Sequence, residues 1–263
     1  MLIQGIRLVG VWNEMTETHS QAAGTFGIDG EDLTGCLANI VLNRVTILQG
    51  QDGAGDIWGS ARNVTYQYSA FLRNLHPVTI SHAPGGEPAQ ARKNLSIHHN
   101  LFAYSHERTP QIRGCNSMVN LEQNIMHQWD AYGFGGGYGT RIRCRNGGCP
   151  DSINMIGNHY TTASVSPSQA LILGETSGND TDQIIIAPQV YMSENFLPPE
   201  NVDFGAALVE FPRDPQAAVT FIPKNDWIDK LLPFIGAPFR KADENQIFSE
   251  VSSQIAQDMS GSP

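Results

Sequence analysis

NLSIHHNLF, residues 94–102, reads as a strand that runs into a bend. Apolar Leu95 and Ile97 alternate with polar neighbours, which is the period of a strand with one buried face. Asn100 follows, and asparagine tolerates the left-handed backbone conformation that a sharp bend between two strands requires. The stretch therefore predicts one corner of a β structure.

Six other nine-residue frames can be stacked on this one without gaps. They begin at residues 5, 39, 63, 118, 152 and 189. Consecutive starts lie 24 to 37 residues apart, which suits solenoid turns that are either bare or extended by an outside loop. The seventh place holds Asn100, Asn124, Asn158 and Asn195 in the last four frames. Stacked about 4.8 Å apart, such side chains can hydrogen-bond to one another.

This repeat predicts an all-β fold, a right-handed parallel β-helix in which residues 1–263 form one domain. A β-sandwich with irregular loops, whose asparagines fall in turns independently, remains the alternative. From Ile222 the pattern changes, and Ile247, Val251 and Ile255 recur at helical spacing. Residues 222–258 are therefore expected to pack on the coils and to end in a helix.

Charge and length limit the classes of partner. The 263 residues carry 26 acidic and 16 basic side chains, a net charge of -10, which argues against nucleic acid or an anionic membrane as the main partner. No apolar run is long enough to span a bilayer, and the N-terminus shows no signal-peptide pattern. The chain enters strand-like sequence at once, which leaves open whether further coils precede it.

Four cysteines are too few for a disulfide scaffold in a chain of this length. Cys144 and Cys149 bracket a short Gly-containing loop and could close it as a disulfide. Two free thiols fit the sequence equally well. A zinc site is less well supported, because no CxxC pair is present.

The segment DGAGDIWGSARNVT contains the first candidate site. Asp52 and Asp56 are four residues apart, so on an extended chain both carboxylates point to the same side. Two such carboxylates repel each other unless a cation lies between them, and calcium suits oxygen ligands in an irregular setting. A pair of solvated turn aspartates is the alternative.

The segment HERTPQIR contains the second candidate site. Arg108 and Arg113 flank Pro110, which interrupts the strand between them. A turn there can bring both guanidinium groups to one surface, where they bind carboxylates through paired hydrogen bonds. Surface ion pairing is the alternative. The preceding His98 and His99 are expected to point to opposite faces, which favours stacking or hydrogen bonding over a metal site.

HHNLFAYSHERTPQIRG resembles the histidine-histidine-asparagine strand and the arginine-proline signature of the pectate lyases, family 1 of the polysaccharide lyases. DGAGDIWGSARNVTYQYSAF is similar to that family's calcium-binding segment, and LPFIGAPFRKADENQIFSEV resembles its closing segment. These matches occur in the family's order over nearly the whole chain.

The resemblance implies a calcium-dependent enzyme that cleaves polygalacturonate by β-elimination. It makes Asp52 and Asp56 calcium ligands, Arg108 the Brønsted base, and Arg113 a ligand of a substrate carboxylate. Because arginine is ordinarily protonated in proteins, an arginine base must be perturbed by neighbouring cations such as calcium and Arg113, and alkaline activity is expected. The resemblance further implies an acidic polysaccharide as partner, a monomer, and a secreted or periplasmic location.

Two departures from the family pattern concern ligands. The family's substrate-binding lysine is absent, and His76 lies nearest its position, with Arg73 and His82 close by in sequence. A further calcium aspartate is also missing, and Glu14 or Glu17 could replace it.

Two other functions therefore stay open. One is a non-catalytic β-helix that binds acidic polysaccharide. The other is a calcium-independent lyase for methylated pectin, although the Asp52 and Asp56 pair speaks against it.

Overall fold

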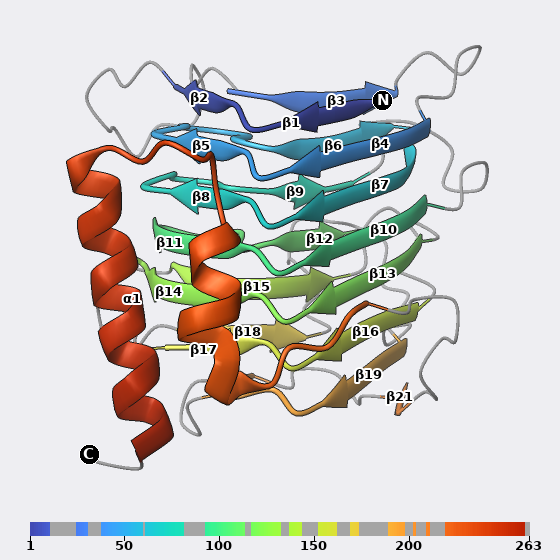
Figure 1. Cartoon of the computed structure of the whole chain (residues 1–263). Helices are drawn as coiled ribbons and strands as arrows, with labels where there is room; N and C mark the ends of the chain where they lie inside the picture. Colours follow the sequence, from blue (N-terminus) through green and yellow to red (C-terminus); the bar gives the residue numbers. More distant parts are fainter. Residues whose placement is uncertain are drawn as a thin grey trace.

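The alternating strand sequences coil into a right-handed parallel β-helix in the computed structural model (Figure 1). The structure describes residues 1–10, 25–30, 38–59, 61–81, 93–113, 117–132, 137–143, 152–161, 169–173, 189–197, 202–203, 209–210 and 219–260. Strand pairing is parallel in all three sheets, which confirms the predicted fold class over a sandwich.

Each of the first six turns of the coil contributes one strand to each of three sheets, and the later described strands continue sheets A and C. Sheet A contains β1 (Leu2–Gln4), β4 (Ala38–Asn43), β7 (Arg62–Gln67), β10 (Lys93–His98), β13 (Ser117–Glu122), β16 (Ser152–Ile156), β19 (Gln189–Ser193) and β21 (Val209–Glu210). Sheet B contains β2 (Arg7–Val9), β5 (Thr46–Leu48), β8 (Ala70–Leu72), β11 (Leu101–Ser105), β14 (Ile125–Trp129) and β17 (His159–Tyr160). Sheet C contains β3 (Gly27–Gly30), β6 (Asp56–Gly59), β9 (Thr79–Ile80), β12 (Gln111–Arg113), β15 (Tyr138–Arg143), β18 (Gln169–Leu173) and β20 (Val202–Asp203).

The register of sheet A confirms six of the seven predicted frames. Leu95 pairs with Val64 and with Val119, as stacking of the frames requires. The first frame is wrong, because Leu2 pairs with Val41 and Arg7 with Thr46. The first rung therefore begins with β1 rather than at residue 5. Each of the five frames that begin at residues 39, 63, 94, 118 and 152 covers two strands and the bend between them.

Asparagines stack into a ladder at the bend between sheets A and B. The Nδ2 of Asn100 donates to Asn124 Oδ1 at 3.1 Å, Asn124 Nδ2 to Asn158 Oδ1 at 3.0 Å, and Asn158 Nδ2 to Asn195 Oδ1 at 2.9 Å. The predicted side-chain ladder is thus confirmed. The left-handed residue is not the asparagine, however, but the residue before it, as at His99 with φ +57°.

This left-handed conformation also corrects the expectation for the two histidines. It breaks the strand alternation at His99, so that its Nδ1 lies 2.7 Å from His98 Nδ1. The His99 ring stacks on Tyr68 with centroids 4.8 Å apart. The pair therefore points to a common space, and the predicted stacking and hydrogen bonding are confirmed.

The core fills the space between the sheets with stacked apolar columns. One column on sheet B consists of Ile47, Phe71, Phe102, Met126 and Tyr160, all at most 1% exposed. The rings of Phe71 and Phe102 stack with centroids 4.8 Å apart. Burial of such columns stabilises rungs that could not form a core alone.

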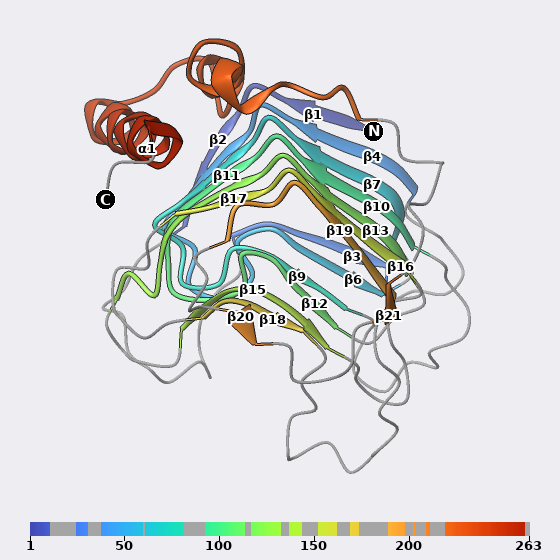
Figure 2. The ribbon, with the colours of Figure 1, turned by 90° about the horizontal axis from the view of Figure 1, so that it is seen from below.

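The C-terminal segment lies outside sheet B (Figure 2). Short helical turns at Lys224–Asp226, Trp227–Leu231 and Leu232–Phe234 lead into α1 (Ala242–Ser260). Ile247, Val251 and Ile255 of α1 are at most 2% exposed, which confirms the helical spacing in the sequence. None of the helices in the described ranges is both long and apolar enough to cross a membrane.

Candidate active site

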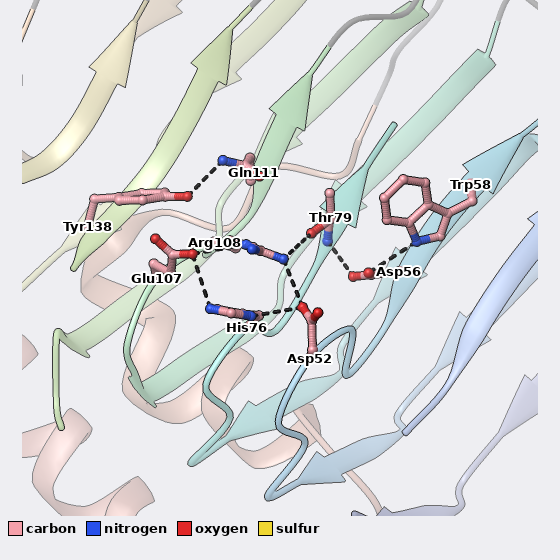
Figure 3. A network of polar contacts seen from close by, with 9 residues as sticks. All are labelled: Asp52, Asp56, Trp58, His76, Thr79, Glu107, Arg108, Gln111 and Tyr138. Atoms are coloured by element: carbon pink, nitrogen blue, oxygen red, sulfur yellow. Dashed lines mark hydrogen bonds and ion pairs between the residues drawn. The ribbon is translucent and has the colours of Figure 1, made fainter. Parts of the chain in front are cut away.

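A column of alternating charge crosses three neighbouring rungs on the loops that lead from sheet B to sheet C. Asp52 follows β5, His76 follows β8 and Glu107 follows β11. They are separated by the same 24 and 31 residues as the paired strands before them, so they occupy one position in successive rungs. An acid, a histidine and a second acid are thereby brought together (Figure 3).

Arg108 lies against this column. Its NH1 is 2.9 Å from Asp52 Oδ1 and 3.4 Å from Thr79 Oγ1, and its Nε is 3.1 Å from Glu107 Oε1. The backbone of Arg108 is left-handed, with φ +64°, and its side chain is 17% exposed. The structure thus brings Asp52 and Arg108 together across two rungs.

His76 joins the two acids from within. Its Nδ1 lies 2.8 Å from Asp52 Oδ1, and its Nε2 makes a 3.1 Å ion-pair contact with Glu107 Oε1. The His76 side chain is 0% exposed. Sequence reasoning made His76 a substrate ligand, but in this arrangement both ring nitrogens face carboxylates of the chain itself.

Burial and charge alternation together set the pKa values of the cluster. Burial acts to lower the pKa of His76, but Asp52 and Glu107 raise it above its ordinary value. Burial acts to raise the pKa of Glu107, yet His76 and Arg108 hold it at about 2. For Arg108, the effect of burial is outweighed by Glu107, Tyr138 and Asp52, so its pKa is raised. These shifts favour an ionised Glu107, a protonated His76 and a protonated Arg108.

Asp56 stands beside the column with its carboxylate turned to backbone and indole donors. Thr79 N donates to Oδ1 at 2.6 Å and Trp58 Nε1 donates to Oδ2 at 3.1 Å. The residue is 6% exposed, and burial raises its pKa to about 6 despite these hydrogen bonds. The alternative of a solvated turn aspartate is therefore wrong for Asp56.

The carboxylate oxygens of the described residues are poorly placed to bind a calcium ion. Calcium takes roughly six to eight oxygen ligands, whereas both oxygens of Asp56 accept N–H groups and Asp52 Oδ1 faces two cationic side chains. In the part of the chain that the structure describes, no three His, Cys, Asp or Glu side chains form a group that could hold a metal. Glu14 and Glu17 lie outside that part.

The other predicted substrate ligands are placed differently. Arg113 ends β12 beside Arg143, and its side chain lies outside the described residues. Arg73 is directed to α1, where its NH1 is 3.3 Å from Asp243 Oδ2. The structure thus does not bring Arg73 to Arg108. His82, Cys144 and Cys149 also lie outside the described residues.

Sequence reasoning missed Glu107. It was treated only as part of the arginine motif, although the frame spacings of 24 and 31 residues place it in the column of Asp52 and His76. Tyr138, whose hydroxyl accepts a 2.7 Å hydrogen bond from Gln111 Nε2, was missed as well (Figure 3). No local motif marks it, because it enters from a later rung.

A pocket of about 580 Å³ lies elsewhere, on the outer face of sheet A. The described residues of its lining carry no acidic or basic side chain other than histidine, and they come from β7, β10, β13, the bends after β7 and β10, and two residues just before the C-terminal segment: Asn63, Val64, Thr65, Gln67, Tyr68, Asn94, Leu95, Ser96, His98, His99, Asn120, Val219 and Thr220. Acid–base chemistry needs the charged side chains gathered around Arg108, so we place the candidate active site there.

The chain is similar over most of its length to fungal proteins. A protein named probable pectate lyase C from Aspergillus flavus is 25% identical over 241 residues, which are 88% of this chain and 53% of that protein. The Aspergillus oryzae protein of the same name has the same identity and coverage. One from Emericella nidulans is 31% identical over 101 residues, 38% of this chain and 21% of that protein. The chain spans about half the length of the curated relatives it matches. No protein-family profile matches it.

Proposed function

This chain is a relative of the pectate lyases, and from that premise we propose that it is a polysaccharide lyase that cleaves polygalacturonate by β-elimination. The observation that carries the proposal is the position of Arg108. The residue that the resemblance makes the base meets Asp52 from two rungs away, at 2.9 Å, on a partly exposed surface of the coil.

The reaction removes the proton from C5 of a uronate. The C5–H electron pair forms a double bond to C4, the C4–O bond breaks, and the departing glycosidic oxygen takes up a proton. One product therefore carries an unsaturated sugar end. Because the C5 proton lies next to a carboxylate, its removal builds negative charge on a group that is already anionic. A cation on that carboxylate lowers the barrier.

We assign proton removal to Arg108 and binding of the substrate carboxylate to Arg113. Guanidinium groups suit both carboxylate recognition and stabilisation of developing charge. Asp52 and Glu107 favour the protonated form of Arg108, which opposes a base. Turnover therefore requires that a bound ligand weaken these contacts, or that alkaline solution supply the neutral form.

Calcium dependence stays a prediction that rests on the resemblance and on Asp52. The site would need oxygen ligands beyond Asp52, such as the predicted Glu14, and we derive no step of the reaction through the ion. A pectic substrate lies outside the cytoplasm, so we also expect the protein to be secreted or periplasmic.

A second candidate is a non-catalytic binder of acidic polysaccharide. The raised pKa of Arg108 favours it, since a permanently protonated guanidinium binds carboxylates but removes no proton.

One experiment separates these functions. The protein is incubated with polygalacturonate in calcium or in EDTA, and ultraviolet absorbance reports the new double bond conjugated to the carboxylate. Rising absorbance that EDTA abolishes is the expected result. A flat trace from folded protein that still binds the polymer would favour the binder. EDTA-resistant cleavage of methylated pectin would favour a calcium-independent lyase.

A further inference from the structure

We propose that Glu107 is a positioning residue that fixes the plane of the Arg108 guanidinium, with His76 as the brace that joins it to Asp52. This inference rests on the proposed function, in which Arg108 takes the substrate proton.

The guanidinium is held at two of its three nitrogens. Glu107 Oε1 lies 3.1 Å from Nε and Asp52 Oδ1 lies 2.9 Å from NH1 (Figure 3). A planar group that is anchored at two nitrogens cannot rotate about its long axis without breaking one contact. We therefore expect NH2, which neither anchor holds, to be the nitrogen that meets a substrate.

The two anchors are themselves tied together. His76 contacts Asp52 at 2.8 Å and Glu107 at 3.1 Å, and its side chain is 0% exposed. Because the three residues sit at one position of successive rungs, the strand spacing of about 4.8 Å fixes their separation. Arg108 is thereby oriented by the coil as a whole, although it stands on a loop with a left-handed backbone.

Misplacement of a reacting group by about 1 Å can cost roughly a hundredfold in rate. Glu107→Gln keeps the shape of the side chain but removes the charge that holds Nε. Loss of this charge also favours the neutral form of Arg108, which acts in the opposite direction. We expect the loss of orientation to outweigh it, so that kcat falls about 10- to 100-fold, with KM changed less than about threefold and the Tm close to that of the unaltered protein. Glu107→Asp, which keeps the charge on a shorter stem, is expected to recover part of the loss.

Glu250→Gln is the matched control. Glu250 is an acid on α1 that bonds to Tyr104, and it belongs to neither the column nor its loops. We expect its kcat to be unchanged. An unchanged kcat in Glu107→Gln, or a loss in kcat that follows a matching loss in Tm, would overturn the positioning role.

The rate of hydrogen exchange of the Arg108 Nε–H, measured by nuclear magnetic resonance, tests whether Glu107 anchors the guanidinium. It needs no turnover. We expect slow exchange in the unaltered protein and in Glu250→Gln, and at least about tenfold faster exchange in Glu107→Gln, because a charge-assisted hydrogen bond is replaced by a weaker one to a neutral amide oxygen. Equal exchange in all three proteins overturns the inference. Faster exchange in a protein that never cleaves polygalacturonate would support the hold and contradict the proposed function.

Discussion

Arg108 is surrounded by groups that oppose the role of a base. Glu107 and Asp52 lie within 3.1 Å of its guanidinium, and they raise its pKa although burial acts to lower it. Sequence reasoning expected neighbouring cations to do the reverse. The acids instead orient the side chain, and the neutral form must come from alkaline solution or from rearrangement on binding.

Arg108→Ala is expected to abolish turnover, by about 10³-fold or more, because it removes the group to which we assign proton removal. Absorbance of the unsaturated product measures the rate, and thermal unfolding should show a transition close to that of the unaltered protein. A variant that keeps near-normal rate would show that another residue is the base.

The rate is expected to rise from pH 7 towards pH 10. Only neutral arginine accepts a proton, and its fraction grows with pH below a pKa that the acids have raised. Initial rates at fixed calcium and saturating polygalacturonate measure this. A steady fall in rate over that range, with the protein still folded, would contradict an arginine base.

Asp56→Ala is expected to lower the free energy of unfolding by about 1 to 3 kcal/mol. It leaves the buried Thr79 N–H and the Trp58 indole N–H without their acceptor. Chemical denaturation measures the change, with Asp243→Ala as control, since the side chain of Asp243 is 48% exposed and its ion pair contributes little. Equal stability of the two variants would contradict this role of Asp56.

Among the structural elements, each bend between sheets A and B depends on two adjacent residues, one for hydrogen bonding and one for its left-handed backbone. Asn124 satisfies donors and acceptors across rungs, while Gln123 before it takes the left-handed conformation with φ +52°. The ladder follows from residue type alone, because amides recur at one place in the frames. The position of the left-handed residue follows from how the chain must turn.

Asn124→Ala is expected to lower the free energy of unfolding by about 1 to 3 kcal/mol. The substitution removes the side chain that hydrogen-bonds to the buried Ile97 O and Asn100 N. The control is Asn94→Ala on the exposed face of β10, which should stay within about 0.5 kcal/mol. Chemical denaturation compares the two variants. A loss in Asn94→Ala as large as in Asn124→Ala would contradict the role of the buried ladder.

For the molecule as a whole, buried neutral histidines link stability to pH. Burial lowers the pKa of His98 to about 3 and of His127 to about 4, and it lowers the pKa of His99 as well. The unfolded chain binds these protons near pH 6.5, before the folded chain does. Their contribution is therefore full above about pH 6.5 and is lost as the pH falls towards 4.

We expect the Tm to fall between pH 7 and pH 4, and to fall less in His127→Gln, which removes one titrating group. Thermal unfolding followed by circular dichroism across this range measures both. A Tm that is independent of pH, or equally dependent in the variant, would contradict the assignment of His127.

The sequence by itself determined the coil, the register of six frames, the asparagine ladder and the helix spacing of Ile247, Val251 and Ile255. These depend on residue type and period, which are local. It also selected Asp52, His76 and Arg108, although not the contacts that define their surroundings.

Only the tertiary structure decided those contacts. Glu107 contacts His76, the ring of His76 lies between Glu107 and Asp52, and Arg73 pairs with Asp243 of α1. The first rung also took a register that the frame pattern did not predict. In each case the partners lie on different rungs or on the packed helix. Loop length and backbone direction determine which side chains come into contact. Neither can be predicted from the alternation of apolar residues within a single strand.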